Sequence, residues 1–392
     1  MPAPRVRPLC VTGYANLNAL GGSRSEILEA LAAGRSGLSA PTESFGFTTA
    51  VGEVHTQLPD LEGELAAWST RIARMAGVLV ADLEEPLRRA RKRWRPERIA
   101  VLMGSSTGGA SATEAAYRHY VSQGALPADY NFQKHHIFNA LLHVVGELTG
   151  AKGPAWMIST ACTSSAKPLA TAQRLMAADI IDAAIVGGVD TLCALTLLGF
   201  QSLQALDRQP CRPFSSERSG ISIGEGGALA LVERAGEPRV LVEGVGETSD
   251  AYHISAPHPE GRGALGAMQG AMDQAGCSSK DIDHINAHGT GTHLNDATEG
   301  IAIARLFADQ VPVVSTKGYT GHTLGAAGAI EFAFASYAIE EGWIPPSLNC
   351  EPLDESAGIL ISKTLLKGDF KRVLSNSFAF GGNNVSVLVR AP

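Results

Sequence analysis

Cys162 is the residue whose type and surroundings most clearly suggest chemistry. It lies in the stretch Ile158-Ser159-Thr160-Ala161-Cys162-Thr163-Ser164-Ser165-Ala166, in which an apolar run gives way to small residues suited to a helix start. The unpaired N–H groups at a helix N-terminus favour the thiolate, which is the nucleophilic form of cysteine. We therefore predict that Cys162 is a catalytic nucleophile with a lowered pKa, and that the remaining cysteines are structural thiols.

Two later segments each place polar side chains in a turn rich in glycine and threonine. One is Asn286–Thr292, which contains His288, and the other is Ser315–Gly325, which contains Lys317 and His322. Ring N–H groups of histidine can stabilise the negative charge that develops on a thioester oxygen. Either histidine alone is as readily structural as catalytic, but both together with a nucleophilic cysteine indicate acyl transfer.

These residues, each within its own motif, resemble the β-ketoacyl-acyl-carrier-protein synthases of the I/II type. The resemblance covers nearly the whole chain and includes Val11-Thr12-Gly13, Arg212-Pro213-Phe214, Gly224-Glu225-Gly226-Gly227 and Asn376–Asn384. No single glycine-rich motif is specific, but several unrelated motifs in the family's order are. The resemblance implies a decarboxylative condensation of a cysteine-bound acyl chain with a malonyl group on an acyl carrier protein. It implies neither a metal nor a cofactor.

The resemblance also implies a division of labour among the reacting groups. Cys162 would accept the acyl group by exchange of thioesters. His288 and His322 would donate hydrogen bonds to the malonyl thioester carbonyl while carbon dioxide departs. Lys317 would keep a histidine oriented, and Glu331 would pair with that lysine.

Residues around the reacting groups are assigned by the same resemblance. The N–H of Phe380 would complete the oxyanion hole, and its ring would gate the pocket. Thr107 lies where a residue at the pocket floor sets chain length, Phe200 where a mobile loop gates the site, and Phe132 where a side chain reaches across a dimer. The other expected substrate-binding residues are Thr290, Thr292 and Phe378.

A carrier-protein substrate implies a docking surface, and the resemblance places Arg71 and Arg74 on it. Charged rims steer and orient acidic partners. The run Arg88–Arg95 also stands out in an acidic chain, but a basic run at a predicted helix end is more often simply solvated. Gln204 lies where many relatives carry an arginine that contacts the carrier, so the sequence leaves the docking surface open.

The resemblance further implies a dimer. Because this chain has a full catalytic set, we expect a homodimer, with a heterodimer of two related subunits as the alternative. Ile221 and Asn383 replace an aromatic residue and a threonine that are common in relatives. With Gln204, they indicate a divergent branch in fatty acid synthesis or in a specialised polyene or polyketide pathway.

Composition excludes several classes of protein. The chain has 392 residues, 45% of them hydrophobic, which is enough for a large core. Its formal charge of −7 argues against nucleic-acid binding. No apolar run has membrane-spanning length, and Met1–Cys10 lacks the apolar core of a secretory signal, so we expect a cytoplasmic protein that does not bind membranes. Six cysteines without CxxC spacing suggest neither zinc nor disulfides.

Short β-branched runs alternate with alanine-rich stretches, which predicts an α/β fold. The clearest expected strands and helices are Ala100–Met103, Ala184–Gly187, Ala228–Val232, Val240–Val245, Ile282–Ile285, Val311–Val314, Lys167–Ala178 and Gly263–Ala275. The alternation restarts after the polar break Glu233–Pro238, so we predict two similar halves, 1–237 and 238–392, with insertions in the first at about 40–150. The resemblance implies that these form the duplicated, five-layered αβαβα thiolase-like fold.

Other acyl-transfer enzymes and a non-catalytic role fit the sequence less well. A thiolase needs a second reactive cysteine in a late Cys-x-Gly turn, and the late turn here follows Phe380 without one. A condensing enzyme of the III type would pair its cysteine with histidine and asparagine rather than with Gly321-His322. A non-catalytic chain-length subunit would lack Cys162, although such a protein remains a candidate partner.

Overall fold

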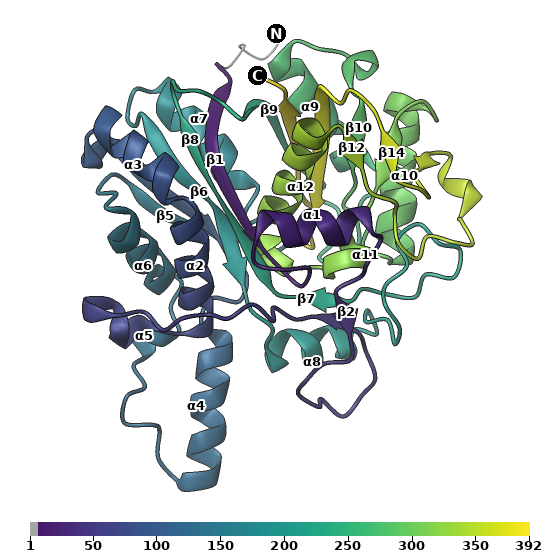
Figure 1. Ribbon diagram of the computed structural model, residues 1–392. Coiled ribbons are helices and arrows are strands. Elements are labelled where there is room, and N and C mark those ends of the chain that lie inside the picture. Colours follow the sequence, from purple (N-terminus) through teal and green to yellow (C-terminus); the bar gives the residue numbers. More distant parts are fainter. Residues whose placement is uncertain (1–6) are drawn as a thin grey trace.

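Eleven strands form one mixed sheet in the computed structural model, which describes residues 7–392 (Figure 1). In spatial order they are β13 (Leu360–Ile361), β11 (Pro312–Val314), β10 (His284–Asn286), β15 (Arg372–Phe378), β16 (Asn383–Arg390), β9 (Val240–Ser249), β1 (Leu9–Leu17), β8 (Gly226–Glu233), β6 (Ala183–Asp190), β4 (Ile99–Gly104) and β5 (Ala155–Ile158). Two small sheets accompany it, made of β2 (Leu38–Ser39), β3 (Val51–Gly52) and β7 (Ile223–Gly224), and of β12 (Trp343–Ile344) and β14 (Leu366–Lys367). All the strands expected from β-branched runs are present.

The two halves of the chain share one strand topology. The first half contributes β1, β4, β5, β6 and β8 in chain order, and the second contributes β9, β10, β11, β15 and β16. Each set lies in space as third, second, fourth, fifth, first, and corresponding neighbours pair with the same orientation, parallel for the first two contacts and antiparallel for the last two. The antiparallel pairing of β1 with β9 joins the halves. The fold is therefore duplicated, as the resemblance implied.

Helices cover these strands in three layers. The central layer is α7 (Lys167–Ala177) and α12 (Ala327–Glu341), which pack in one hydrophobic core with strands of both halves. Outside the first half lie α2 (Arg71–Asp82), α3 (Glu84–Arg93) and α6 (Asn139–Thr149), and outside the second lie α9 (Arg262–Ala275) and α10 (His293–Phe307). With two strand layers between them, these helices give the expected five-layered αβαβα arrangement.

The sequence of α12 explains why this helix occupies the centre. Every residue from Ala327 to Ala338 is buried, and nearly all are apolar, which is typical of a helix enclosed on all sides. Small residues allow close approach, since a Cβ at Gly328 would lie only 2.8 Å from the Cβ of Ala166. The N-terminal ends of α7 and α12 are thereby brought together in the interior.

Long helical insertions distinguish the first half from the second. Helices α2 and α3 and two 3-10 turns lie between β1 and β4, and α4 (Ala110–Gln123), α5 (Phe132–His135) and α6 lie between β4 and β5. Helix α4 and the loop after it project from the body of the molecule (Figure 1). The remaining helices are α1 (Arg24–Ala32), α8 (Ala194–Ser202) and α11 (Lys317–Thr320). Of the stretch Met1–Cys10, residues 1–6 lie outside the described residues. Within residues 7–392, no helix is both long and apolar enough to cross a membrane.

Candidate active site

Cys162 lies on a tight turn between β5 and α7. Ala161 has a φ of 52°, a left-handed conformation that is unusual for alanine, and the Ser164 N–H donates to the Ala161 carbonyl at 3.1 Å. Regular helix begins only at Lys167, so the cysteine precedes the helix rather than lying in its first turn. The turn projects the thiol into the interior between the two halves.

The second half places its polar groups at the matching point of the topology. Lys317 and His322 lie between β11 and α12, as Cys162 lies between β5 and α7, and His288 follows β10. The carboxyl ends of these parallel strands face the same region, where open α/β sheets bind ligands. The duplicated fold therefore brings together four side chains that are up to 160 residues apart in sequence.

His322 directs one ring nitrogen at the cysteine. Its Nε2 lies 3.0 Å from Cys162 Sγ, and its Nδ1 accepts a hydrogen bond from the Leu324 N–H at 3.1 Å. A nitrogen that accepts from an amide carries no proton, so the ring proton is on Nε2. Burial and the nearby Lys317 ammonium hold the pKa of His322 well below its usual value. His322 is thus a neutral imidazole whose N–H points at the reacting sulfur.

His288 has the same tautomer for a different reason. Lys317 Nζ lies 3.2 Å from His288 Nδ1, and an ammonium can only donate, so the ring proton is again on Nε2. Burial, followed by the charge of Lys317, lowers the pKa of His288 well below its usual value. The two imidazole rings are 5.1 Å apart and nearly perpendicular. Both histidines therefore present an N–H donor to one small region.

Lys317 is held by a buried partner. Its Nζ lies 2.5 Å from Glu331 Oε1 on α12 and 2.5 Å from the carbonyl oxygen of His288. Burial raises the pKa of Glu331 to about 7, and Lys317 opposes this rise. The structure thus contains the Lys317–Glu331 pair that the resemblance implied, and this pair holds the positive charge of Lys317 next to Nδ1 of His288.

The cysteine and the two histidines also have the spacing of a metal site, since one ligand atom from each lies within 4.8 Å of the others. A metal would need a lone pair on each Nε2. Both Nε2 atoms carry protons, because both Nδ1 atoms are occupied as acceptors by Leu324 and Lys317. The donor set therefore fits an oxyanion and does not fit a metal ion.

The thiol of Cys162 differs from the sequence prediction. Burial raises its pKa to about 11, while Lys317 and the N–H groups of Phe380 and Cys162 act in the opposite direction. The prediction of a lowered pKa was wrong because it considered the local turn and ignored the desolvation of a fully enclosed thiol. The resting residue is a protonated thiol at neutral pH. Its surrounding donors would stabilise charge that develops during the reaction.

Two buried carboxylates that the sequence analysis missed hold the His288 turn. Glu299 accepts from the N–H groups of His288 and Gly289, both at 2.8 Å, and burial raises its pKa to about 7. Asp296 accepts from the Thr290 N–H at 2.9 Å. A possible signal was their spacing, because carboxylates three residues apart share a helix face, and α10 follows this glycine-rich turn directly.

An open cavity of about 260 Å³ leads to Cys162, His288 and His322. Four of the expected substrate-binding residues also line it, namely Phe200, Thr290, Thr292 and Phe378. Phe380 lines it as well, with its ring 6.0 Å from that of Phe200. Gln204 and Ile221, the two unusual residues noted in the sequence, are part of the same wall.

Thr107 and Phe132 are placed elsewhere. The Thr107 hydroxyl donates to the buried Asp190 at 2.7 Å, and neither residue lines the cavity. Phe132 is half exposed on α5 and stacks on His136 at 4.6 Å. Thr107 therefore does not line this cavity, and its role at a pocket floor stays a prediction.

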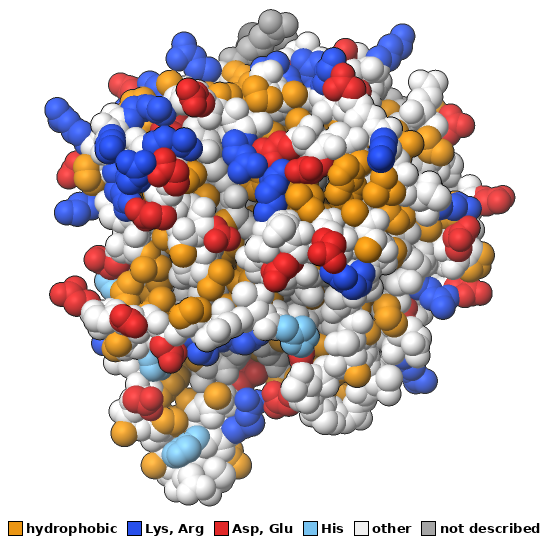
Figure 2. Space-filling view, viewed as in Figure 1, with side chains coloured by type: hydrophobic (Ala, Val, Ile, Leu, Met, Phe, Trp, Pro, Cys, Tyr) orange, Lys and Arg blue, Asp and Glu red, His pale blue; other side chains and the backbone are white. Residues whose placement is uncertain are grey.

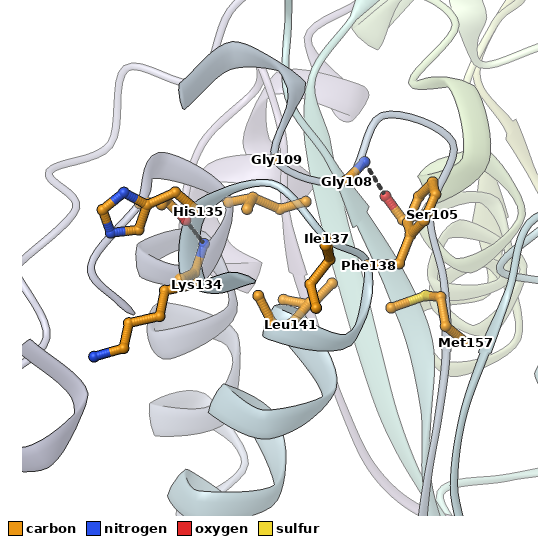
Figure 3. Close-up of a pocket in the computed structure, with 13 residues that line it drawn as sticks. Ser105, Gly108, Gly109, Lys134, His135, Ile137, Phe138, Leu141 and Met157 are labelled. Carbon is orange, nitrogen blue, oxygen red and sulfur yellow. Dashed lines mark hydrogen bonds between the residues drawn. The ribbon is translucent and has the colours of Figure 1, made fainter. Parts of the chain in front are cut away.

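A second, nearly filled cavity lies behind the Thr107 turn (Figure 3). Ile137, Phe138, Leu141 and Met157 converge on it, and the Gly108 N–H donates to the Ser105 hydroxyl at its edge. Its volume of about 10 Å³ is enough for no more than one water molecule. None of the reacting residues lines this cavity, so the larger one is the candidate acyl site.

The two arginines expected to dock a carrier protein have other partners. Arg71 forms an ion pair with the buried Glu225 and donates to the Val54 carbonyl at 2.9 Å, so its guanidinium is bound within the chain, and its docking role stays a prediction. Arg74 lies 3.3 Å from the exposed Asp60. Among residues 7–392, no lysine or arginine lines the cavity that leads to Cys162.

The basic run forms the outer face of α3. Lysine and arginine side chains gather over this helix at the upper left of Figure 2. Arg88 and Arg91 pair with Glu85 and Glu84 of the same helix, and Arg93 pairs with the buried Glu233. This arrangement matches the expectation of a solvated helix end, and the salt bridges are an additional observation.

Comparison with known proteins gives one consistent result. The sequence matches the beta-ketoacyl synthase N-terminal domain over residues 6–237 and the C-terminal domain over residues 240–351. It is 31% identical to nodulation protein E of Rhizobium meliloti strain 1021, over 96% of this chain and 98% of the relative. It is 34% identical to 3-oxoacyl-[acyl-carrier-protein] synthase 2 of Staphylococcus aureus, over 75% and 77% of the respective chains.

Solved structures resemble the whole chain. One chain from a complex of the ketosynthase ApeO with its chain length factor ApeC from Xenorhabdus doucetiae is 36% identical, with a TM-score of 0.92 and coverage of 98% of both chains. A chain of the ishigamide ketosynthase/chain length factor is 26% identical, with a TM-score of 0.90 and coverage of 99% of this chain and 100% of the other.

Proposed function

The chain belongs to the β-ketoacyl synthase family, and on that premise we propose that Cys162, His288 and His322 carry out its condensation reaction. The family consists of acyltransferases that join an acyl group to a malonyl thioester with loss of carbon dioxide. The observation that carries the assignment is the pair of neutral imidazoles, one of them 3.0 Å from the cysteine sulfur, that both present Nε2–H groups to one cavity.

The first half-reaction is acylation of Cys162. The sulfur attacks the carbonyl carbon of an acyl thioester, and the N–H groups of Cys162 and Phe380 stabilise the oxyanion. The carrier thiolate leaves and takes up the proton that the cysteine loses. A buried thiol is suited to this exchange, because the charge appears only next to preorganised donors.

The second half-reaction uses the histidines. The carbon–carbon bond to the malonyl carboxylate breaks, carbon dioxide leaves, and the electron pair forms an enolate whose oxygen accepts from the Nε2–H groups of His288 and His322. The enolate carbon attacks the carbonyl of the cysteine-bound acyl group. A new carbon–carbon bond forms, the carbon–sulfur bond breaks, and the released thiolate takes up one proton. The product is a β-ketoacyl thioester.

Lys317 acts through His288 in this proposal. Its ammonium occupies Nδ1 and so keeps the ring proton on Nε2, where the enolate forms. Glu331 fixes the lysine in turn. Lys317 and Glu331 therefore position His288 and do not contact the substrate. The two histidine donors are neutral at neutral pH, because burial and the charge of Lys317 lower the pKa of both rings.

We propose acyl carrier proteins as the source of both substrates, in fatty acid synthesis or in polyketide synthesis. Similarity to the 3-oxoacyl-[acyl-carrier-protein] synthase 2 of Staphylococcus aureus and to the ketosynthase complex from Xenorhabdus doucetiae supports this substrate class. The thiolase alternative has less support, because in the part of the chain that is described Cys162 is the only cysteine lining the cavity. The same proposal places the enzyme in the cytoplasm, as the sequence analysis expected.

The partner in this proposal is a related subunit of the chain-length-factor kind. Two similar solved structures are of a ketosynthase with such a factor, which favours the heterodimer over the homodimer expected from the sequence. Strand β5 is one of the two edge strands of the large sheet, and it exposes Trp156. Tyr117, Tyr120 and Val121 are exposed on the projecting helix α4. Free strand edges and exposed apolar helices are common features of protein interfaces.

Intact mass measurement tests the proposed reaction. The protein is incubated with a panel of acyl carrier proteins, and the expected result is a mass increase of one acyl group that is absent from Cys162→Ala. Addition of malonyl carrier protein should then discharge the acyl group as a β-ketoacyl product. Light scattering with and without a co-expressed cysteine-free relative tests the partner. A stable monomer that condenses substrates at micromolar concentration would contradict the subunit proposal.

A further inference from the structure

Exposed apolar side chains surround the mouth of the cavity that leads to Cys162. Leu203 at the end of α8 is 62% exposed, Leu294 at the start of α10 is 61% exposed, and Phe380 is 42% exposed, and all three line the cavity. Tyr252 and Ile254, at 56% and 81% exposed, lie on the loop whose Ser255 and Pro257 also line it. We call Leu203, Tyr252, Ile254, Leu294 and Phe380 the apolar collar.

The collar is assembled from four separate segments of the chain, two of which are directly connected. The Gly381 N–H donates to the Ile254 carbonyl at 2.8 Å, and the Asp250 N–H donates to the Gly382 carbonyl at 2.8 Å. These bonds join the Tyr252–Ile254 loop to the Phe380 turn. Such a group of large exposed side chains is unusual on a protein surface and typically marks an interaction site.

Within the described part of the chain, the walls of the cavity offer no positive side chain to an acidic partner. Among residues 7–392, no lysine or arginine lines the cavity. Asp250 does line it, but its two carboxylate oxygens accept from Asn384 Nδ2 at 2.9 Å and from the His258 N–H at 3.1 Å. The dense basic surface is on α3, which lies at the opposite end of the molecule from α8 (Figures 1 and 2).

We propose that the apolar collar is the docking surface for the acyl carrier protein and that apolar contact, rather than ion pairing, holds the carrier there. This inference rests on the proposed function, because a substrate tethered to a carrier reaches Cys162 only if the carrier body sits on the rim of the cavity. The complementary surface is an apolar helix face of the carrier. Binding of this kind changes little with ionic strength, whereas ion-paired docking weakens steeply as salt rises.

Steady-state kinetics with two malonyl substrates tests this assignment. The substrates are malonyl carrier protein and malonyl pantetheine, which has the same reacting thioester without the protein, and in both assays Cys162 is re-acylated from the same acyl pantetheine at saturating concentration. Ile254→Ser combined with Tyr252→Ser should raise KM for the carrier substrate roughly tenfold, the size of effect expected when interface anchors are lost. The rate with malonyl pantetheine should stay unchanged. For the wild-type enzyme, KM for the carrier should vary little between about 50 and about 500 mM salt.

Two matched controls separate this surface from others. Ile180→Ser removes an exposed apolar side chain of similar size in the turn before β6 and should leave KM unchanged. Charge reversal of Arg88, Arg89 and Lys92 on α3 should also leave KM unchanged.

Four results would contradict the assignment of the apolar collar as the docking surface. They are an unaltered carrier KM in the Ile254/Tyr252 variant, an equal loss with both substrates, a steep salt dependence, or a large effect of the α3 reversal. Loss of subunit association in light scattering would assign the collar to a subunit contact instead. Failure of the wild-type enzyme to acylate Cys162 or to turn over malonyl pantetheine would count against the proposed function itself, and is therefore distinguishable.

Discussion

The turn between β5 and α7 and the turn between β11 and α12 occupy the same place in the two halves, yet they do different chemistry. Each contains a non-glycine residue in the left-handed region, Ala161 at 52° and Leu324 at 53°. The first turn carries the thiol that forms the covalent bond, and the second carries Lys317 and His322, which form hydrogen bonds and supply charge. A duplicated fold therefore provides two equivalent frames whose side chains have diverged into complementary roles.

The two turns also differ in what burial does to them. Burial raises the pKa of Cys162 to about 11 and so works against the charged nucleophile. Burial lowers the pKa of His288 and His322 and so favours the neutral donors. Burial therefore favours the neutral form of the two histidines before substrate binds. It favours the reaction of Cys162 only when negative charge develops next to the N–H groups of Cys162 and Phe380.

Removal of the nucleophile should have the largest effect. Cys162→Ala should abolish acyl loading and condensation, because no other cysteine among the described residues lines the cavity. The fold should persist, since alanine is small enough for the same turn. Intact mass and product assays provide the check, with circular dichroism as the control for folding. Condensation by Cys162→Ala at the wild-type rate would remove the first turn from the mechanism.

Removal of the buried ammonium should be nearly as damaging. Lys317→Met leaves Glu331 buried without its partner, and breaking a buried pair in this way typically costs about 3–5 kcal/mol of unfolding free energy. The double variant Lys317→Met with Glu331→Gln should recover part of that stability. It should not recover condensation, because Nδ1 of His288 still lacks its donor. Denaturant unfolding and condensation rates measure the two effects, and full recovery of activity in the double variant would contradict the positioning role.

Glu299 should produce a smaller, pH-dependent effect. Burial raises its pKa from 4.5 to about 7, so the native state keeps a proton that the unfolded chain loses at lower pH. Its contribution to the unfolding free energy should therefore fall as pH rises from about 4.5 to about 7. Relative to Glu299→Gln, which cannot titrate, the wild-type protein should lose stability across that window. Parallel unfolding curves for the two proteins at every pH would show that the carboxyl does not titrate there.

Thr107 should have the smallest effect. Its hydroxyl is one of several donors to Asp190, so Thr107→Val should cost about 1 kcal/mol of unfolding free energy and Thr107→Ser should cost less. Product chain length should be the same for both variants as for the wild-type enzyme. A change in product length with Thr107→Val but not with Thr107→Ser would restore Thr107 to the acyl pocket.

Local pattern predicted much of this molecule because strands and motifs depend on neighbours in sequence. The run Ala184–Gly187 lies within β6, and the expected helix Lys167–Ala178 differs from α7 by one residue. The motifs around Cys162 and His322 likewise led to residues that meet in space.

The sequence did not predict contacts between side chains that lie far apart along the chain. Arg71 is bound by Glu225, 154 residues away, and Thr107 by Asp190, 83 residues away. No local pattern reports such contacts. The pKa of Cys162 depended on enclosure by both halves, and the role of Glu299 depended on the position of the His288 backbone, so neither could be derived from spacing alone.

The most direct test of the division between the cysteine turn and the two histidines is acyl loading in the histidine variants. His288→Ala and His322→Ala are each incubated with acyl carrier protein and analysed by intact mass, and condensation is then followed with malonyl carrier protein. Loss of one such donor typically costs about 2.7–4 kcal/mol of barrier, so condensation should fall about 10²- to 10³-fold. Cys162 should still acquire the acyl group in both variants. Loss of loading in step with loss of condensation, in correctly folded protein, would contradict the account, because the histidines would then be needed to form the covalent bond as well.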